Sequence, residues 1–214
     1  MTPTLYIFAG LPGTGKSTLS QWLAREVGAA YLRIDTIEQG LRDLCSVEVQ
    51  GEGYGLAYRI AADNLRVGRS VVADSCNPIE PTRRAWERSA REAGADYVHV
   101  EVVCSDRREH RLRAETRAPT VPGLRLPTWS EIESREVHPW TVDRVIVDTA
   151  GRSPEECGRE LLSRITPQRR SRSSATDAAS LALPPSTPFP TETNEAETNS
   201  WPCSRARTSW PPRS

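Results

Sequence analysis

Short apolar runs alternate with longer segments of helical period along the first 166 residues. The apolar runs are rich in Val, Ile and Tyr, as strands are; they are Leu5–Ala9, Ala30–Ile34, Ser70–Asp74, Tyr97–Val103 and Arg144–Val147. The segments of helical length between them are Lys16–Val27, Thr36–Leu44, Tyr54–Val67, Pro81–Ala93 and Arg107–Thr116. This alternation predicts an α/β domain with a five-stranded parallel sheet and helices on both faces.

The fourth of these strands differs from the others. Polar and apolar residues alternate from Tyr97 to Val102, whereas a central parallel strand is usually apolar throughout. The alternation predicts either that the strand lies nearer an edge of the sheet or that one of its faces opens onto a ligand crevice.

The end of the domain is predicted from a capping signal and a change of composition. Ser153-Pro154-Glu155-Glu156 combines a capping Ser, a Pro at the first helical position and a Glu three residues past the cap, which predicts a helix to about Ile165. Residues 1–166 therefore form the predicted domain. Residues 167–214 are rich in Pro, Ser and Arg and are predicted to be a disordered tail. Two alternatives stay open, a partner-binding segment that uses Trp201 and Trp210, or the product of a shifted reading frame.

Charge and cysteine usage limit the class of protein. The 28 basic and 28 acidic residues give a formal net charge of zero, whereas a dedicated nucleic-acid or membrane-surface protein would show a basic excess. No apolar run reaches the roughly 18 residues of a membrane span. The five cysteines form no CxxC pair, which favours free thiols in a reducing compartment. We therefore expect a cytoplasmic protein without a membrane partner, as a monomer or dimer.

A phosphate-binding motif follows the first strand. The pattern G-x-x-x-x-G-K-[ST] is matched without exception by Gly10-Leu11-Pro12-Gly13-Thr14-Gly15-Lys16-Ser17. Its glycines let backbone N–H groups turn toward a phosphate at a helix N-terminus. Lys16 is the only lysine of the chain and would reach the β- and γ-phosphates, while Ser17 would ligate Mg²⁺. The loop from Gly10 to Thr18 is therefore predicted to bind ATP with Mg²⁺.

Two acidic residues follow predicted strands, where ligands of open parallel sheets bind. Asp74 ends the third strand and is the candidate for holding Mg²⁺ together with Ser17. Asp35 ends the second strand and could accept the proton of a substrate hydroxyl. The two roles could be exchanged, and Asp35 could instead cap the helix that begins at Thr36.

Arg113 and Arg117 lie four residues apart on one predicted helical face, before a loop with three prolines (118–127) that could close as a lid. They are the candidates for neutralising charge on a transferred phosphoryl group. The histidines at 99, 110 and 138 have no neighbours at metal-ligand spacing.

These segments together resemble the P-loop kinase-like ATP-binding proteins, the relatives of polynucleotide kinase, gluconate kinase and the zeta toxins. The resemblance rests on Gly10–Thr18, Asp35 with Arg42, Asp74–Pro78 and the Arg113–Arg117 pair, and it covers residues 4–165. It implies a P-loop NTPase sandwich of three layers, with strand order 2-3-1-4-5 and an arginine lid. It also implies an acceptor pocket near the second and third helices.

We therefore expect an ATP-dependent kinase that moves the γ-phosphate to a hydroxyl of a small-molecule acceptor. In this interpretation Lys16, Asp35, Asp74, Arg113 and Arg117 are catalytic. One alternative is a nucleoside, nucleotide or 5′-hydroxyl polynucleotide kinase, which the absence of a long basic stripe disfavours. Another is a regulatory ATPase or nucleotide switch without an acceptor.

Overall fold

The computed structural model describes residues 2–176. Its strands are β1 (Thr4–Ala9), β2 (Ala30–Arg33), β3 (Val71–Asp74), β4 (Asp96–Val103) and β5 (Val145–Asp148). Its helices are α1 (Lys16–Val27), α2 (Ile34–Cys45), α3 (Glu52–Arg66), α4 (Glu80–Glu92), α5 (Arg107–Thr116), α6 (Trp129–Glu133) and α7 (Pro154–Thr176).

The strands form one parallel sheet in the order β2-β3-β1-β4-β5, which confirms the predicted fold class and strand order. β1 lies at the centre, with Leu5 opposite Val71 of β3 and Tyr97 of β4. Because the strands are parallel, their carboxyl ends meet at one edge of the sheet. The loop after β1 and the ends of β2 and β3 are therefore neighbours.

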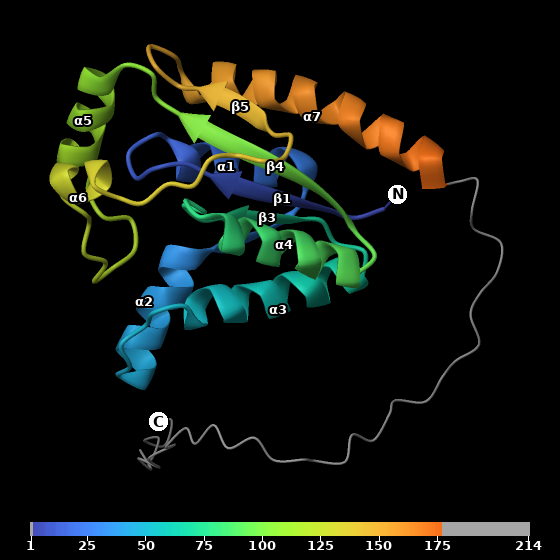
Figure 1. Ribbon diagram of the computed structural model, residues 1–214, viewed down its shortest axis with the longest axis horizontal. Helices are drawn as coiled ribbons and strands as arrows, with labels where there is room; N and C mark the ends of the chain where they lie inside the picture. Colours follow the sequence, from blue (N-terminus) through green and yellow to red (C-terminus); the bar gives the residue numbers. More distant parts are fainter. Residues whose placement is uncertain (1, 177–214) are drawn as a thin grey trace, which may run out of the picture. The chain divides into compact units, whose positions relative to one another are not determined.

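Helices cover the sheet on both faces (Figure 1), and alternate residues of β1, β2 and β3 enter two separate cores. Tyr6 and Phe8 of β1 face the core shared with α1 and α7. Leu5 and Ile7 face the core shared with α3 and α4, where Trp86 is fully buried. Both faces of the central strand are thus excluded from water, as its continuous apolar run predicts.

The structure differs from the sequence prediction at two helices. α6 is a five-residue helix that the prediction omits, although Thr128 and Glu131 form a capping box at its start. α7 continues to Thr176, whereas the predicted helix ends at about Ile165. The first ten residues of the predicted tail, 167–176, therefore have helical backbone, and the tail prediction for 177–214 lies outside the described residues.

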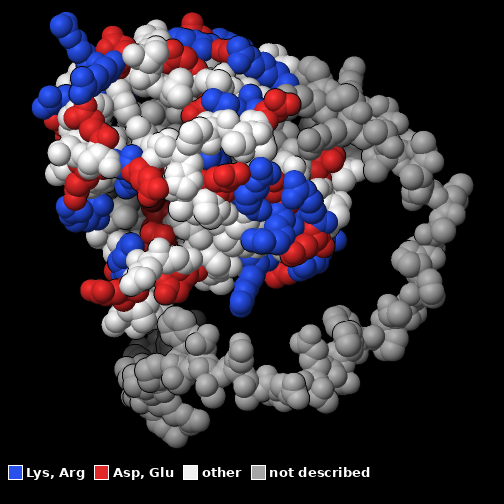
Figure 2. Space-filling model, viewed as in Figure 1, with Lys and Arg blue, Asp and Glu red and all other residues white. Residues whose placement is uncertain are grey.

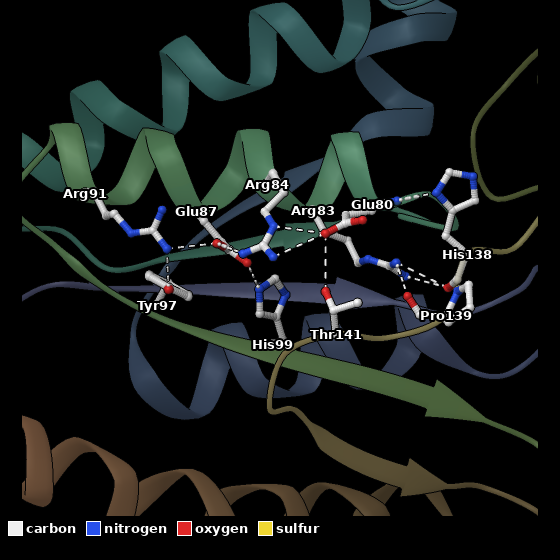
Figure 3. Close-up of polar contacts among 10 residues, drawn as sticks. All are labelled: Glu80, Arg83, Arg84, Glu87, Arg91, Tyr97, His99, His138, Pro139 and Thr141. Carbon is white, nitrogen blue, oxygen red and sulfur yellow. Dashed lines mark hydrogen bonds and ion pairs between the residues drawn. The ribbon is translucent and has the colours of Figure 1, made fainter.

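The polar face of β4 is covered by α4. His99 Nε2 lies 3.0 Å from Glu87 Oε1, and Glu87 also accepts hydrogen bonds from Arg84 at 3.2 Å and Arg91 at 2.9 Å (Figure 3). Glu87 and His99 are both buried. β4 lies between β1 and the edge strand β5, so it is nearer an edge than β1, as one of the two predicted explanations requires.

Basic and acidic side chains are interspersed on the face shown in Figure 2, and no large area of a single charge covers it. This agrees with the zero formal net charge of the chain. Within residues 2–176, no helix combines the length and the apolar character that crossing a bilayer would require.

We expect His99 to make the protein less stable in mild acid. Burial and the nearby Arg83 and Arg84 lower the pKa of His99 below its usual 6.5, although Glu87 acts in the opposite direction. The folded protein therefore keeps His99 neutral at a pH at which the unfolded chain binds a proton. The free energy of unfolding should consequently fall as the pH drops through 6.5.

The variant His99→Gln retains a donor for Glu87 but does not titrate, so it should lose this part of the pH dependence. Urea unfolding of both proteins at about pH 7.5 and about pH 5.5 measures it. An equal loss of stability in the two proteins would contradict the assignment to His99.

Candidate active site

The loop between β1 and α1 has the backbone that the phosphate-binding motif requires. Gly10 and Gly13 adopt φ values of 142° and 92°, in the region that favours glycine. Gly15 precedes α1 with φ 87° and provides no side-chain cap. The N–H groups of the first turn of α1 are therefore left without a capping side chain, which suits them to an anion.

Side chains from three other segments hold this loop and the end of β1 in place. They come from the segment after β3, from α5 and from the segment after β5. The contacts are Asn77 Nδ2 to Phe8 O at 2.7 Å, His110 Nε2 to Pro12 O at 2.9 Å and Thr149 Oγ1 to Thr14 O at 2.9 Å. Each acceptor is a backbone carbonyl, so these three side chains occupy none of the N–H groups of the loop.

Lys16 and Asp74 form a buried ion pair under the loop. Lys16 Nζ lies 2.9 Å from Asp74 Oδ1, and the two side chains are 9% and 1% exposed. Tyr31 Oη donates to the other Asp74 oxygen at 2.6 Å. Burial alone would raise the pKa of Asp74, but Lys16 and hydrogen bonds from Tyr31 and Ser17 lower it. Although burial opposes this, Asp74 raises the pKa of Lys16, so both groups are ionised near neutral pH.

A cavity of about 1470 Å³ extends from the phosphate-binding loop toward α2, α3 and the 118–127 loop. Asp35 lines it in the first turn of α2, and Arg33 Nη2 donates to Asp35 Oδ2 at 3.3 Å. The prediction that Asp35 ends the second strand is wrong, because β2 ends at Arg33 and the helix begins at Ile34. Its carboxylate nevertheless faces the cavity that the loop borders.

Arg113 and Arg117 both line the cavity, but they do not share a helical face as predicted. α5 ends at Thr116, and Arg117 has extended backbone with φ −65° and ψ 139°. Arg113 donates to Thr149 Oγ1 at 2.9 Å and to Thr149 O at 3.0 Å. Arg113 is thus connected through Thr149 to the phosphate-binding loop. Arg117 lies outside the helix and does not share this orientation.

A model of the AAA domain family (AAA_33) matches residues 5–126, more than half of the chain. The chain belongs to this family. The match includes the phosphate-binding loop, Asp35, Asp74 and both arginines of the predicted site. No curated protein sequence matches this AAA domain.

Solved structures with a similar fold include kinases. A gluconokinase from Sinorhizobium meliloti 1021 is 19% identical, over 80% of this chain and 98% of that chain, with a TM-score of 0.57. The Mycobacterium tuberculosis APS kinase CysC, solved with AMPPNP and APS, is 20% identical over 76% and 96%, also at 0.57. Chaetomium thermophilum Kti12, solved with ADP-AlF3, is 20% identical over 75% and 96%, at 0.54. The predicted P-loop kinase-like fold of this AAA domain is thereby confirmed.

Sequence reasoning missed several residues of the site. Tyr31 and Arg33 reach Asp74 from β2, because Arg33 pairs in register with Asp74 across the sheet. Thr149 and His110 hold the phosphate-binding loop. Of these residues, only Arg33 could have been proposed from the sequence, since it stands two residues before Asp35. The contacts of the others depend on tertiary packing.

The close approach of the loop to β4 predicts a stability effect at Gly10. A Cβ atom added there would lie 2.3 Å from the Val102 carbonyl oxygen, in a backbone conformation unfavourable to alanine. Gly10→Ala should lower the free energy of unfolding by about 2 kcal/mol or more.

Gly55→Ala is the matched control, since Gly55 lies in α3 and an added Cβ would meet nothing within 4 Å. That variant should be neutral or more stable by up to about 1 kcal/mol. Urea unfolding compares the two. Equal stabilities would show that the loop does not need glycine at position 10.

Proposed function

We propose that this AAA domain transfers the γ-phosphoryl group of ATP to a hydroxyl of a small acceptor. The observation that carries the proposal is one cavity that is lined by both the phosphate-binding loop and the Asp35 carboxylate. Its volume of about 1470 Å³ exceeds the roughly 300–1,000 Å³ of a pocket for one small ligand, which leaves space for a second substrate. The similarity in fold to known kinases supports the proposal.

In this mechanism the loop N–H groups and Lys16 bind the β- and γ-phosphates. Asp35 accepts the proton of the acceptor hydroxyl as its oxygen forms a bond to Pγ. The bond between Pγ and the bridging oxygen breaks, and its electron pair leaves with ADP. Lys16 and Arg113 offset the negative charge on the transferring group.

The donor set also fits Mg²⁺. The Ser17 hydroxyl and the ionised Asp74 carboxylate are hard oxygen donors, and Ser17 helps to lower the pKa of Asp74. Mg²⁺ is usually held by one or two carboxylates together with substrate phosphates, and when bound it supplies charge neutralisation at those phosphates. Among residues 2–176 no group of three or more His, Cys, Asp or Glu side chains could hold a metal without such help.

The cytoplasm remains the expected compartment, because the cysteine usage of the chain favours free thiols in a reducing environment.

The test is ADP release by the full chain with Mg-ATP, alone and with a panel of sugars, sugar acids, nucleosides and 5′-hydroxyl oligonucleotides. We expect one class of acceptor to stimulate release. Asp35→Ala should reduce the stimulated rate by about 10²–10⁴-fold, because general-base catalysis contributes that much, and should leave ATP affinity unchanged.

Glu48→Ala is a control that removes one carboxylate from an exposed position outside the cavity lining. It should behave as the wild type. Steady turnover that no acceptor alters would instead indicate a regulatory ATPase, and wild-type transfer by Asp35→Ala would contradict the role of Asp35.

A further inference from the structure

Arg117 is a partly buried cation without an acidic partner. Within the described residues 2–176, no carboxylate oxygen lies within 4.0 Å of its guanidinium, and its buried Nε has no hydrogen-bond acceptor. Burial lowers the pKa of Arg117, although Asp35 acts in the opposite direction. A buried donor without an acceptor is costly, so this site is suited to an anion from outside the chain.

Arg117 lines the same cavity as Asp35, the proposed base, and lies close enough for the two charges to interact. The charged groups that act on it are Asp35 and Arg33, together with the Cys76 thiol, and none belongs to the phosphate-binding loop. Arg113 differs, since Thr149 connects it to the carbonyl of Thr14 in that loop. Thr149 thus holds Arg113 beside the phosphate-binding loop, and no such hydrogen bond within the described residues holds Arg117 there.

Arg33 adds a second guanidinium beside Asp35. Its side chain is 12% exposed and is oriented by Thr120 Oγ1 at 2.7 Å and by Asp35 Oδ2 at 3.3 Å. Its buried Nε has no hydrogen-bond acceptor but lies 3.8 Å from Asp74 Oδ2, so Arg33, unlike Arg117, has acidic partners. Arg117 therefore supplies the guanidinium without an acidic partner, and Arg33 is a second, already oriented guanidinium beside the carboxylate proposed as the base.

Two other arginines of the cavity lining have acidic partners. Arg42 bonds to Glu38, and Arg125 bonds to Glu131. Asp35 and Glu38 are the only acidic residues among the described residues that line the cavity, so its basic side chains outnumber its acidic ones. An anion that enters the cavity therefore meets a surplus of positive charge.

We propose that the acceptor carries, besides its hydroxyl, an anionic group such as a carboxylate, phosphate or sulfate, which Arg117 binds together with Arg33. This inference rests on the proposed function. A guanidinium binds oxyanions through two parallel N–H bonds, so it can both attract the acceptor and orient it. Binding of the anion at Arg117 would direct the acceptor hydroxyl toward Asp35.

Inorganic sulfate is the probe for this anion site. The full chain is saturated with Mg-AMPPNP, so that the phosphate-binding loop is occupied, and Tm is measured against sulfate concentration at constant ionic strength. Binding to the folded state raises Tm. Arg117→Gln should weaken the sulfate affinity by about 10- to 100-fold, as expected for hydrogen bonds to a charged group. The sulfate affinity of Arg117→Lys should lie between that of the wild type and that of Arg117→Gln.

Arg111→Gln is the matched control, since Arg111 lies on α5, pairs with Glu115 and does not line the cavity. It should respond to sulfate as the wild type does. No saturable effect of sulfate, or an equal effect in Arg117→Gln, would overturn the proposal. So would a loss of AMPPNP affinity in Arg117→Gln with sulfate binding intact, because Arg117 would then serve the nucleotide.

The ADP-release assay separates failure of this inference from failure of the proposed function. It should compare each anionic acceptor with a neutral counterpart, for example gluconate with glucose and a nucleoside monophosphate with its nucleoside. Preference for anionic acceptors, with a KM that Arg117→Gln raises, supports both. Stimulation by neutral acceptors alone would overturn the inference and leave the kinase proposal standing. Sulfate binding through Arg117 without any acceptor-dependent turnover would count against the kinase and leave the anion site standing.

Discussion

The ion pair between Lys16 and Asp74 joins the start of α1, next to the central strand β1, to the end of β3, and the site depends on this connection. Lys16 begins α1 after the loop that follows the central strand, and Asp74 ends the adjacent strand β3, so the parallel pairing of β1 and β3 lets the two side chains come within 2.9 Å. A buried pair of this kind is stable only when the remaining donors and acceptors are satisfied, and loss of one partner typically costs about 3–5 kcal/mol. Tyr31 satisfies the second oxygen of Asp74 from β2. The pair therefore requires β1, β2 and β3 to be assembled together.

This arrangement prepares the loop for a phosphate. Lys16 is ionised and oriented, and the N–H groups at the start of α1 lack a capping side chain. His110 and Thr149 bond to carbonyls of the loop, and Asn77 bonds to the carbonyl of Phe8 at the end of β1. Preorganised charges need little reorientation when the ligand arrives, which is how electrostatic binding becomes strong in a site that excludes water. The cavity beyond the loop carries the Asp35 carboxylate, so phosphate binding and acceptor chemistry share one space.

The parts of the site that follow from local pattern were predictable, and those that depend on packing were not. The loop was predictable because its glycines, lysine and serine stand at set spacings between a strand and a helix. Asp74 was predictable because it ends an apolar run. Tyr31 reaches Asp74 only through the pairing of β2 with β3, and Arg117 leaves its helical face because α5 ends at Thr116. The order of the strands came from a family resemblance, since no residue pattern in the chain specifies it.

Calorimetric titration of Mg-AMPPNP into the full chain tests the central claim most directly, since it measures nucleotide binding without requiring an acceptor. The account predicts one binding site in the wild type and a loss of affinity of at least about 100-fold in Lys16→Met, because a buried charge-assisted contact to phosphate disappears. The Met side chain keeps most of the aliphatic volume of lysine, and thermal unfolding of the variant checks that it is folded. Equal affinity in the two proteins, or no binding by the wild type, would contradict a phosphate site built on Lys16.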